Sequence, residues 1–184
     1  SKKNFSANRS KLGANFGTPR QRLNSYGHNL PLTDFEVLSF TLQYELDYPN
    51  VLYFLSQIDA PLYTDQRITA SDLKQGFLRN PLIIAGGPCV RSNPLPMTPF
   101  IDFFYTGDLE VILDKFLDSI IKNRKHEEDE TFDAKIITDL LNLPGMWTLN
   151  KNICQNPIYN KKMGAIYETL STYNAKNYLE PIIS

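Results

Sequence analysis

The sequence contains little cysteine and little histidine. Among its 184 residues there are two histidines and two cysteines, Cys89 and Cys154. Two isolated thiols cannot build a disulfide framework, and they supply at most half of a four-ligand zinc site. They also cannot replace the cysteine set that holds an iron–sulfur cluster. We therefore predict reduced thiols, and neither zinc nor an iron–sulfur cluster in this chain.

An excess of charge and a long apolar run are missing as well. There are 19 Lys and Arg residues against 20 Asp and Glu residues, so no overall field attracts nucleic acid or an anionic membrane. No apolar stretch approaches the roughly 20 residues of a membrane-spanning helix. The polar start, SKKNFSANRS, lacks the apolar core of a secretory signal. These absences predict a cytoplasmic, soluble protein with no membrane partner and no direct nucleic-acid partner.

What the sequence does contain is an alternation of strand and helix patterns. Buried strands are predicted at 35–43, 82–85 and 101–105 from their apolar runs. Helical spacing of apolar residues follows at 48–58, at 109–120 and again before Pro144. Strands that alternate with helices favour a parallel sheet covered on both faces. We expect three apolar pairs to be buried on adjacent parallel strands: Leu38 and Phe40, Ile83 and Ile84, Phe103 and Phe104.

The domain organisation follows from these patterns. Residues 31–147 are predicted to form a doubly wound, mostly parallel α/β domain of Rossmann-like type. Residues 1–30 are predicted to be irregular, and residues 148–184 to form a linker or a wrapping tail. Only three strands are visible, whereas a doubly wound sheet usually has more. Either the irregular ends complete the sheet, or the sheet lacks a strand at its N-terminal edge.

Unusual residues occupy the loops that follow the three strands. In an open parallel sheet these loops border the ligand crevice. Glycine has no Cβ and allows a backbone to approach a planar ring or a phosphate, but it also permits a tight turn without a ligand. The acids could instead cap a helix, and the cysteine could be a small buried residue. The candidate binding residues are Gln43, Tyr44, Glu45, Gly86, Gly87, Pro88, Cys89, Thr106, Gly107, Asp108 and Glu110.

Four sequence blocks resemble a known family. Read in order, they are DFEVLSFTLQYELDYPNVL, PLIIAGGPCVRSNPLPM, FIDFFYTGDLEVIL and LLNLPGMW. Their order and spacing are similar to the amino-terminal half of a family of radical SAM proteins with a cobalamin-binding-type domain. The resemblance implies a cobalamin-binding-type fold, cobalamin as the candidate cofactor and the candidate residues as its binding positions. It also implies a radical SAM barrel as partner, in the same chain or a separate one, or a larger protein assembly.

The chain departs from this family in ways that leave two functions open. The cluster motif Cys-x-x-x-Cys-x-x-Cys is absent, so the chain could act in an enzyme only as part of a radical SAM enzyme. The family's opening strand and helix are not recognisable, and Leu109 stands where the family has a second glycine, which predicts local strain. One function is a cobalamin-binding accessory domain. The alternative is a degenerate relative that no longer binds cofactor and acts as a scaffold or subunit.

Overall fold

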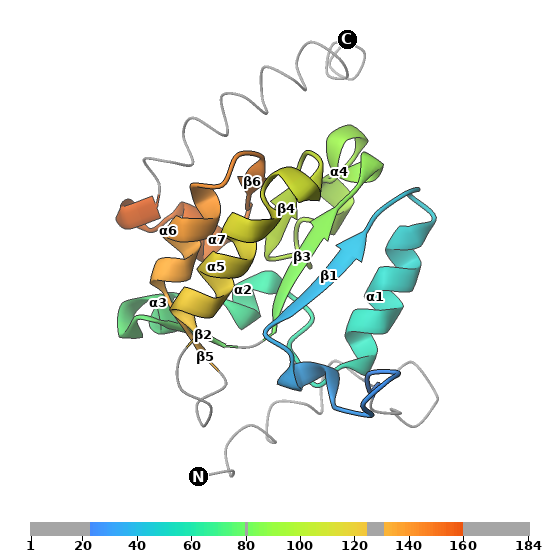
Figure 1. Cartoon of the computed structure of the whole chain (residues 1–184), viewed down its shortest axis with the longest axis horizontal. Coiled ribbons are helices and arrows are strands. Elements are labelled where there is room, and N and C mark those ends of the chain that lie inside the picture. Colours follow the sequence, from blue (N-terminus) through green and yellow to red (C-terminus); the bar gives the residue numbers. More distant parts are fainter. Residues whose placement is uncertain (1–22, 80, 125–130, 160–184) are drawn as a thin grey trace.

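The central feature of the fold is a four-stranded, mostly parallel sheet. The computed structural model describes residues 23–79, 81–124 and 131–159. In strand order, the sheet consists of β1 (Val37–Thr41), β3 (Leu82–Gly86), β4 (Phe103–Tyr105) and β6 (Met146–Trp147). The first three strands run parallel, and β6 runs antiparallel to β4 (Figure 1). The predicted α/β class with a mostly parallel sheet is confirmed.

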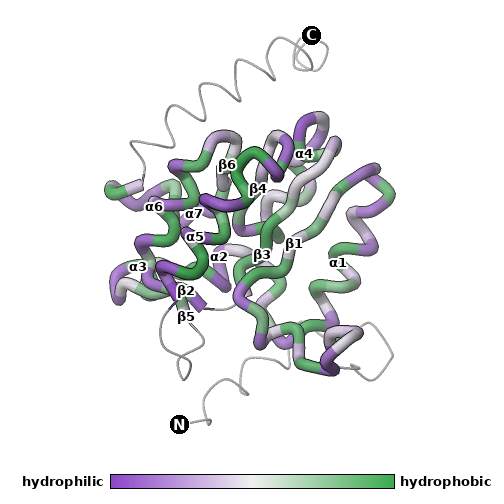
Figure 2. The backbone as a smooth tube through the Cα atoms, in the orientation of Figure 1, coloured by the Kyte–Doolittle hydropathy of each residue, from purple (hydrophilic) through white to green (hydrophobic). Residues whose placement is uncertain are grey.

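Helices cover both faces of this sheet. On one face lies α1 (Asp47–Gln57), and on the other lie α5 (Leu113–Asn123) and α6 (Lys135–Leu141), as Figure 1 shows. Strand β3 serves both layers, because Ile83 packs in the cluster on the α1 side and Ile84 in the cluster on the α6 side. Its apolar character on both faces is typical of a central parallel strand. The tube in Figure 2 is accordingly green through much of β3.

Short elements connect these layers. Two short helices, α4 (Pro88–Ser92) and α7 (Lys151–Cys154), follow β3 and β6. Single 3₁₀ turns lie at η2 (Leu32–Asp34), η3 (Leu95–Met97) and η4 (Leu109–Val111). Together with the sheet loops, they shape the ends of the domain.

A polar insertion between α1 and β3 forms structure of its own. It holds α2 (Thr64–Arg67), α3 (Ala70–Gln75) and β2 (Phe77–Arg79), and β2 pairs antiparallel with β5 (Thr131–Asp133). Helix α3 begins with a capping box between Thr69 and Asp72 and ends at Gly76 in the left-handed conformation. The sequence patterns did not predict this second sheet.

Burial of the three predicted pairs differs between the centre and the edge of the sheet. The pairs on β3 and β4 are buried, as predicted. The expectation for β1 is wrong: Leu38 and Phe40 are only half-buried, because β1 is the last strand of the described sheet. Phe40 instead packs edge to face against Phe54 of α1, with 5.3 Å between ring centroids. The outer edge of β1 therefore faces no other strand of the described residues.

The predicted helix at 109–120 also differs in detail. The 3₁₀ turn η4 comes first, and α5 begins only at Leu113. The strain predicted at Leu109 is not found, because Asn29 is the one described residue other than glycine with a positive φ. A leucine therefore fits this position without a backbone penalty.

The chain beyond β6 packs into the core as far as the structure describes it. The Thr148 hydroxyl donates to the Asp102 carbonyl at 2.6 Å, and Ile153 and Tyr159 are buried. These residues belong to the segment for which a linker or tail was predicted. The rest of that segment, 160–184, and residues 1–22 of the predicted irregular start lie outside the described residues. No helix in the described part is long and apolar enough to cross a membrane.

Candidate functional site

The three loops that carry the candidate residues start side by side. Thr41 pairs with Gly86, and Ala85 pairs with Phe104, so β1, β3 and β4 end at the same edge of the sheet. We call this edge, with the loops 42–46, 87–97 and 106–111 that leave it, the C-terminal edge. It lies at the upper end of the sheet in Figure 1.

The glycine pair at the end of β3 is explained by a contact within the chain. Gly87 has a φ of 102°, and a Cβ placed on it would lie 2.8 Å from the Leu42 carbonyl oxygen. The backbone of Leu42 is held there by two hydrogen bonds: its N–H donates to the Gly86 carbonyl at 2.8 Å, and its carbonyl accepts from the Cys89 N–H at 3.0 Å. A Cβ on Gly86 would meet only an ordinary contact, 3.6 Å from the Tyr105 carbonyl. Glycine is thus required at 87 for the chain's own packing.

The loop after β1 is held by hydrogen bonds to the first residue of α1, Asp47. The N–H groups of Gln43 and Tyr44 donate to Asp47 Oδ2 at 3.0 and 3.1 Å. The side chains of this loop, those of Gln43, Tyr44 and Glu45, are exposed and available to a partner. The backbone N–H groups of Gln43 and Tyr44 are not available, because both donate to Asp47.

Cys89 lies beneath the surface of this edge. Pro88, the first residue of α4, is exposed, whereas Cys89 is buried and its thiol contacts the Tyr48 hydroxyl. The Tyr48 hydroxyl donates to the Asn93 carbonyl at 2.6 Å. Burial, and next the hydrogen bond with Cys89, raise the pKa of Tyr48 well above its ordinary value. Tyr48 therefore ties α1 to the segment that follows α4.

The loop after β4 is held by β6. Trp147 Nε1 donates to Thr106 Oγ1 at 2.9 Å, and the Thr106 N–H donates to the Gly145 carbonyl at 2.8 Å. Gly145, which the sequence analysis did not single out, has a φ of 81°, and a Cβ there would collide with the Thr106 carbonyl. Gly145 therefore shapes this loop through its close contact with Thr106.

The remaining candidates of this loop surround Tyr105. A Cβ on Gly107 would lie 2.8 Å from the Tyr105 hydroxyl, which donates to the Asp108 carbonyl at 2.8 Å. Burial, followed by the charges of Asp108 and Glu110, raises the pKa of Tyr105. Asp108 and Glu110 are exposed, and the Asp108 side chain makes no capping hydrogen bond to η4. The capping alternative is therefore not seen at Asp108.

The strained glycines of this edge are explained without a corrin. A Cβ on Gly87 would meet the Leu42 backbone and one on Gly107 would meet the Tyr105 hydroxyl, so contacts within the chain account for both glycines. The one histidine of the described chain, His28, lies in the loop before β1 rather than after a strand. The described residues also contain no group of three or more His, Cys, Asp or Glu side chains placed to hold a metal.

A buried ion pair lies at the opposite end of the sheet. Asp102, the residue before β4, is fully buried and accepts hydrogen bonds from Arg67 Nε, from the Thr64 hydroxyl at 2.5 Å and from the Ile83 N–H at 2.8 Å. Arg67 also donates to three carbonyls, those of Pro61, Leu62 and Phe100. A buried charge pair is tolerated only when its polar atoms are paired in this way. The sequence patterns did not reveal this pair, although Asp102 stands in the third of the four blocks, FIDFFYTGDLEVIL.

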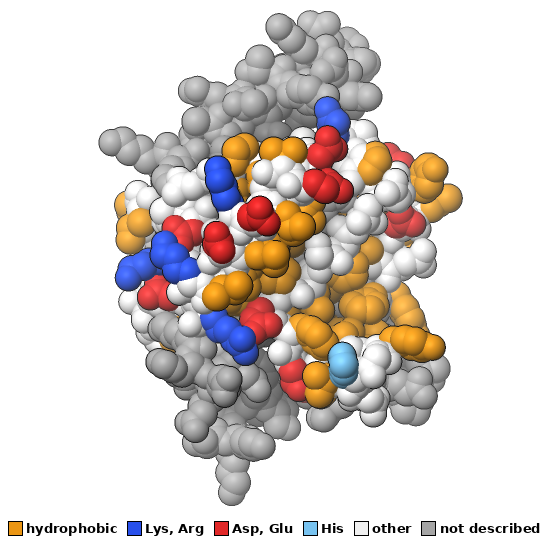
Figure 3. Space-filling model, viewed as in Figure 1, with side chains coloured by type: hydrophobic (Ala, Val, Ile, Leu, Met, Phe, Trp, Pro, Cys, Tyr) orange, Lys and Arg blue, Asp and Glu red, His pale blue; other side chains and the backbone are white. Residues whose placement is uncertain are grey.

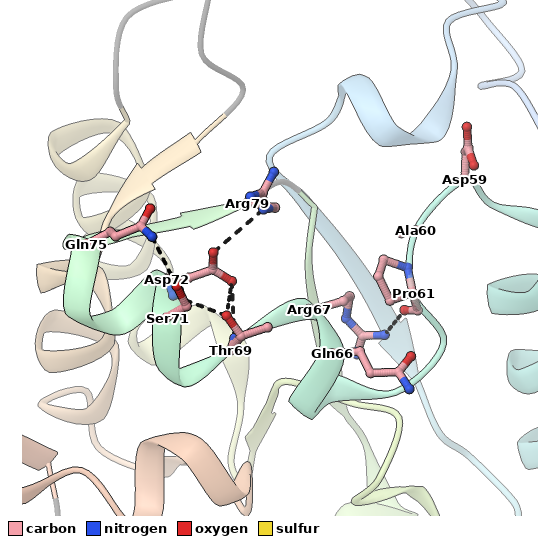
Figure 4. A pocket seen from close by; sticks show the side chains of 10 residues that line it. All are labelled: Asp59, Ala60, Pro61, Gln66, Arg67, Thr69, Ser71, Asp72, Gln75 and Arg79. Carbon is pink, nitrogen blue, oxygen red and sulfur yellow. Dashed lines mark hydrogen bonds and ion pairs between the residues drawn. The ribbon is translucent and has the colours of Figure 1, made fainter. Parts of the chain in front are cut away.

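A polar cavity of about 360 Å³ lies beside this ion pair. Figure 4 shows its lining, in which Arg79 approaches Asp72 at 3.8 Å and Arg67 reaches Pro61. The Asp72 carboxylate also closes the capping box of α3. Because these charged side chains are paired within the insertion, we interpret the cavity lining as structural rather than as a binding site.

Comparison with known proteins agrees with the resemblance at the level of the family. The profile of the family described as "Radical SAM proteins, N-terminal" matches residues 5–148. An uncharacterised protein of Methanocaldococcus jannaschii is 32% identical over 79 residues, which cover 43% of this chain and 14% of that protein. The chain thus corresponds to a small part of this relative, and no solved structure matches it. The chain belongs to the family of N-terminal domains of radical SAM proteins.

Proposed function

We propose that this domain is a non-catalytic accessory domain that docks, by its C-terminal edge, on the cluster-bearing catalytic part of a radical SAM protein. One observation carries the proposal. Five large apolar side chains, between 40% and 84% exposed, lie in the loops that leave this edge. They are Tyr44, Leu46, Leu95, Leu109 and Val111.

The physical reason is the cost of leaving such side chains in water. Each fully exposed leucine or valine forgoes roughly 1.5–3 kcal/mol of burial. Grouped at one edge by parallel strands, they resemble the apolar centre of an interface more than a random surface. Figure 3 shows hydrophobic side chains exposed at this end of the molecule. Family membership supplies the kind of partner, because the domain is the N-terminal part of radical SAM proteins.

The more specific alternative is that the domain binds cobalamin, as the resemblance implies. The contacts of Gly87 and Gly107 with their own chain weigh against it, because they account for the glycines without a ligand. We therefore favour the scaffold function over a corrin carrier. Under this proposal the chain contributes binding and orientation, and the partner contributes the radical chemistry.

A binding titration tests this proposal. The whole chain is titrated with a separately expressed radical SAM segment that carries the Cys-x-x-x-Cys-x-x-Cys motif and comes from the same genome. We expect saturable binding that is lost when Leu46 and Val111 are both changed to Asp. The matched control changes Tyr53 and Ile158 to Asp, because both are also large, apolar and well exposed (61% and 73%) but lie outside this edge. Saturable binding of hydroxocobalamin to the same chain would overturn the choice between the two functions.

A further inference from the structure

The outer edge of β1 presents backbone groups that no described strand pairs. Among the described strands, β1 has one neighbour, β3. The Glu36 carbonyl accepts from the first residue of β3 at 2.9 Å, and the Leu42 N–H donates to its last residue at 2.8 Å. Backbone groups alternate in direction along a strand. Those of Val37, Ser39 and Thr41 therefore point away from β3, which leaves three N–H groups and three carbonyls at the edge.

Nothing in β1 itself prevents this edge from pairing. Natural edge strands are usually protected by Lys, Pro or a β-bulge. The sequence of β1, VLSFT, contains no charged residue and no proline. Its register with β3 runs one to one from Val37 to Thr41, so there is no bulge either. The strand is therefore suited to accept a further strand.

An exposed apolar row of α5 lies beside this edge. Leu113, Leu117 and Ile121 are spaced four residues apart on one side of the helix, and they are 38% to 72% exposed. Arg124 continues the same side, and its Nε lies 2.9 Å from Glu36 Oε1, next to the start of β1. The row is therefore turned toward the β1 side of the molecule. Figure 3 shows hydrophobic side chains running over this helix.

The neighbouring segments of the chain are poor candidates to cover the row. Residues 125–130, which follow α5, read KHEEDE and contain no apolar side chain. The described chain begins at Leu23, which lines a small cavity with Gln57 and Ile58 at the end of α1. Helix α1 lies on the opposite face of the sheet from α5 (Figure 1). These observations favour a cover from another molecule.

We propose that β1 pairs antiparallel with β1 of a second copy of this chain, about a two-fold axis at Ser39. In this register Ser39 pairs with itself, and Val37 pairs with Thr41 of the second copy. All the outward N–H and carbonyl groups of both strands then form hydrogen bonds. Leu38 lies opposite Phe40 of the second copy, in the type of pair whose side chains approach most closely. An interface with two-fold symmetry requires such self-complementarity.

The surroundings of β1 fit the same symmetry. The axis is perpendicular to the sheet, so the two four-stranded sheets become continuous and both α5 helices lie on one face. Their apolar rows face each other across the paired strands, and removing them from water favours association. Because β1 carries no charge, no like charges oppose each other across the axis. The C-terminal edge takes no part in this pairing and stays free to dock.

Sedimentation of the full-length chain over a dilution series tests the proposal. We expect twice the mass of the chain, with dissociation on dilution. Ser39→Pro should keep the pairing with β3, because the N–H that it removes points outward. It deletes two hydrogen bonds at the axis and should raise the dissociation constant at least about tenfold. Ser39→Lys sets two positive charges against each other and should do the same, whereas Ser71→Lys, exposed on α3, should not.

The α5 row has its own variant. Changing Leu117 and Ile121 to Asp should raise the dissociation constant at least about tenfold, because their burial in the dimer is lost. Both side chains are exposed in the single chain, so the variant folds. The matched control is Ile158→Asp, which is also exposed but follows α7. Equal dissociation constants for the row variant and its control would remove α5 from the interface.

A cross-link identifies the pairing itself. In a hydrogen-bonded antiparallel pair the Cα atoms lie about 5.5 Å apart, within the range of a disulfide. Ser39→Cys in a Cys154→Ser background should therefore give a covalent dimer with oxidised glutathione, whereas Ser71→Cys should not. Cys89 is buried and does not react.

Three results would overturn the proposal. They are a monomer at every concentration, a dimer that both Ser39→Pro and Ser39→Lys leave intact, and the absence of the cross-link. A monomer would show that the edge stays open or is covered from within the chain. No radical SAM segment is present in these measurements, so their outcome does not depend on the docking proposed above.

Discussion

The two ends of the central sheet are built in opposite ways. Where β3 and β4 begin, the ion pair of Arg67 and Asp102 is buried and joined to four segments of the chain. At the C-terminal edge, the loops turn on glycines and expose large apolar side chains such as Leu46 and Val111. One end pairs a buried carboxylate with a buried guanidinium inside the protein, and the other leaves large apolar side chains exposed.

The two ends therefore differ in role: the first contributes to the stability of the fold, and the second to binding a partner. A paired charge in the interior adds little net stability but is costly to break, because the surviving partner is left uncompensated. An exposed leucine adds little to folding, yet it contributes to an interface once a partner covers it. Substitutions at the first end should therefore change the free energy of unfolding, whereas those at the second should change binding.

The largest effect is expected from Asp102→Ala. The change leaves the buried Arg67 guanidinium without its counter-ion, which should lower the free energy of unfolding by roughly 3–5 kcal/mol. Urea denaturation followed by circular dichroism measures this loss. The control is Glu36→Ala, which removes the partly exposed partner of Arg124 and should cost no more than about 1 kcal/mol. Equal losses in the two variants would erase the contrast between buried and exposed ion pairs.

A smaller but clear loss is expected from Gly87→Ala. The new Cβ meets the Leu42 carbonyl while the backbone holds a φ of 102°, and such strain costs about 1–3 kcal/mol. Its neighbour serves as control, because a Cβ on Gly86 meets only an ordinary contact at 3.6 Å. Thermal denaturation of both variants compares them directly. If Gly86→Ala is the more damaging change, the explanation offered for the glycine pair fails.

Next comes Tyr48→Phe, which tests the support beneath the C-terminal edge. Loss of the hydrogen bond to Asn93 should cost about 1 kcal/mol at neutral pH. Because the pKa of Tyr48 is raised in the folded protein, its stabilising contribution is complete below pH 10 and decreases as the pH rises beyond that value. The variant should therefore lose less stability than the parent between about pH 10 and pH 11. A Tyr53→Phe control removes the hydroxyl of an exposed tyrosine. Identical alkaline profiles for parent and Tyr48→Phe would refute the assignment.

The smallest effect on folding is expected from Leu46→Asp combined with Val111→Asp. Both side chains are exposed, and surface changes of this kind usually alter the free energy of unfolding by no more than about 0.5 kcal/mol. Docking to the radical SAM segment should nevertheless be lost. A large loss of stability in this variant would show that the edge contributes to the fold itself.

The parts of the fold that follow local patterns could be predicted from sequence. The apolar runs around Ile83 and Phe103 form strands because both of their faces are buried. The shared edge of the three loops follows from parallel pairing alone. These features depend on neighbours in the chain or on a general rule of topology.

Features that depend on distant partners could not be predicted. Asp102 reads in sequence as one acid within an apolar run, and nothing nearby identifies Arg67, 35 residues earlier, as its partner. The reason for glycine at 87 is a backbone contact with Leu42, which no local pattern reveals. The exposure of Leu113 and Leu117 is likewise a property of the neighbouring elements, because their spacing suggests a buried helix face.

The polar cluster around Asp102 also has a consequence for synthesis on the ribosome. Asn150 donates to the Thr64 carbonyl and hydroxyl at 2.9 and 3.0 Å, across 86 residues of chain. At about 5–20 residues per second, the ribosome needs roughly 4–17 s to make that stretch. Until Asn150 has emerged, the insertion and the first strands lack the groups that complete the cluster. The nascent domain should therefore remain without its final packing for several seconds, during which chaperones have access to β1 and β3.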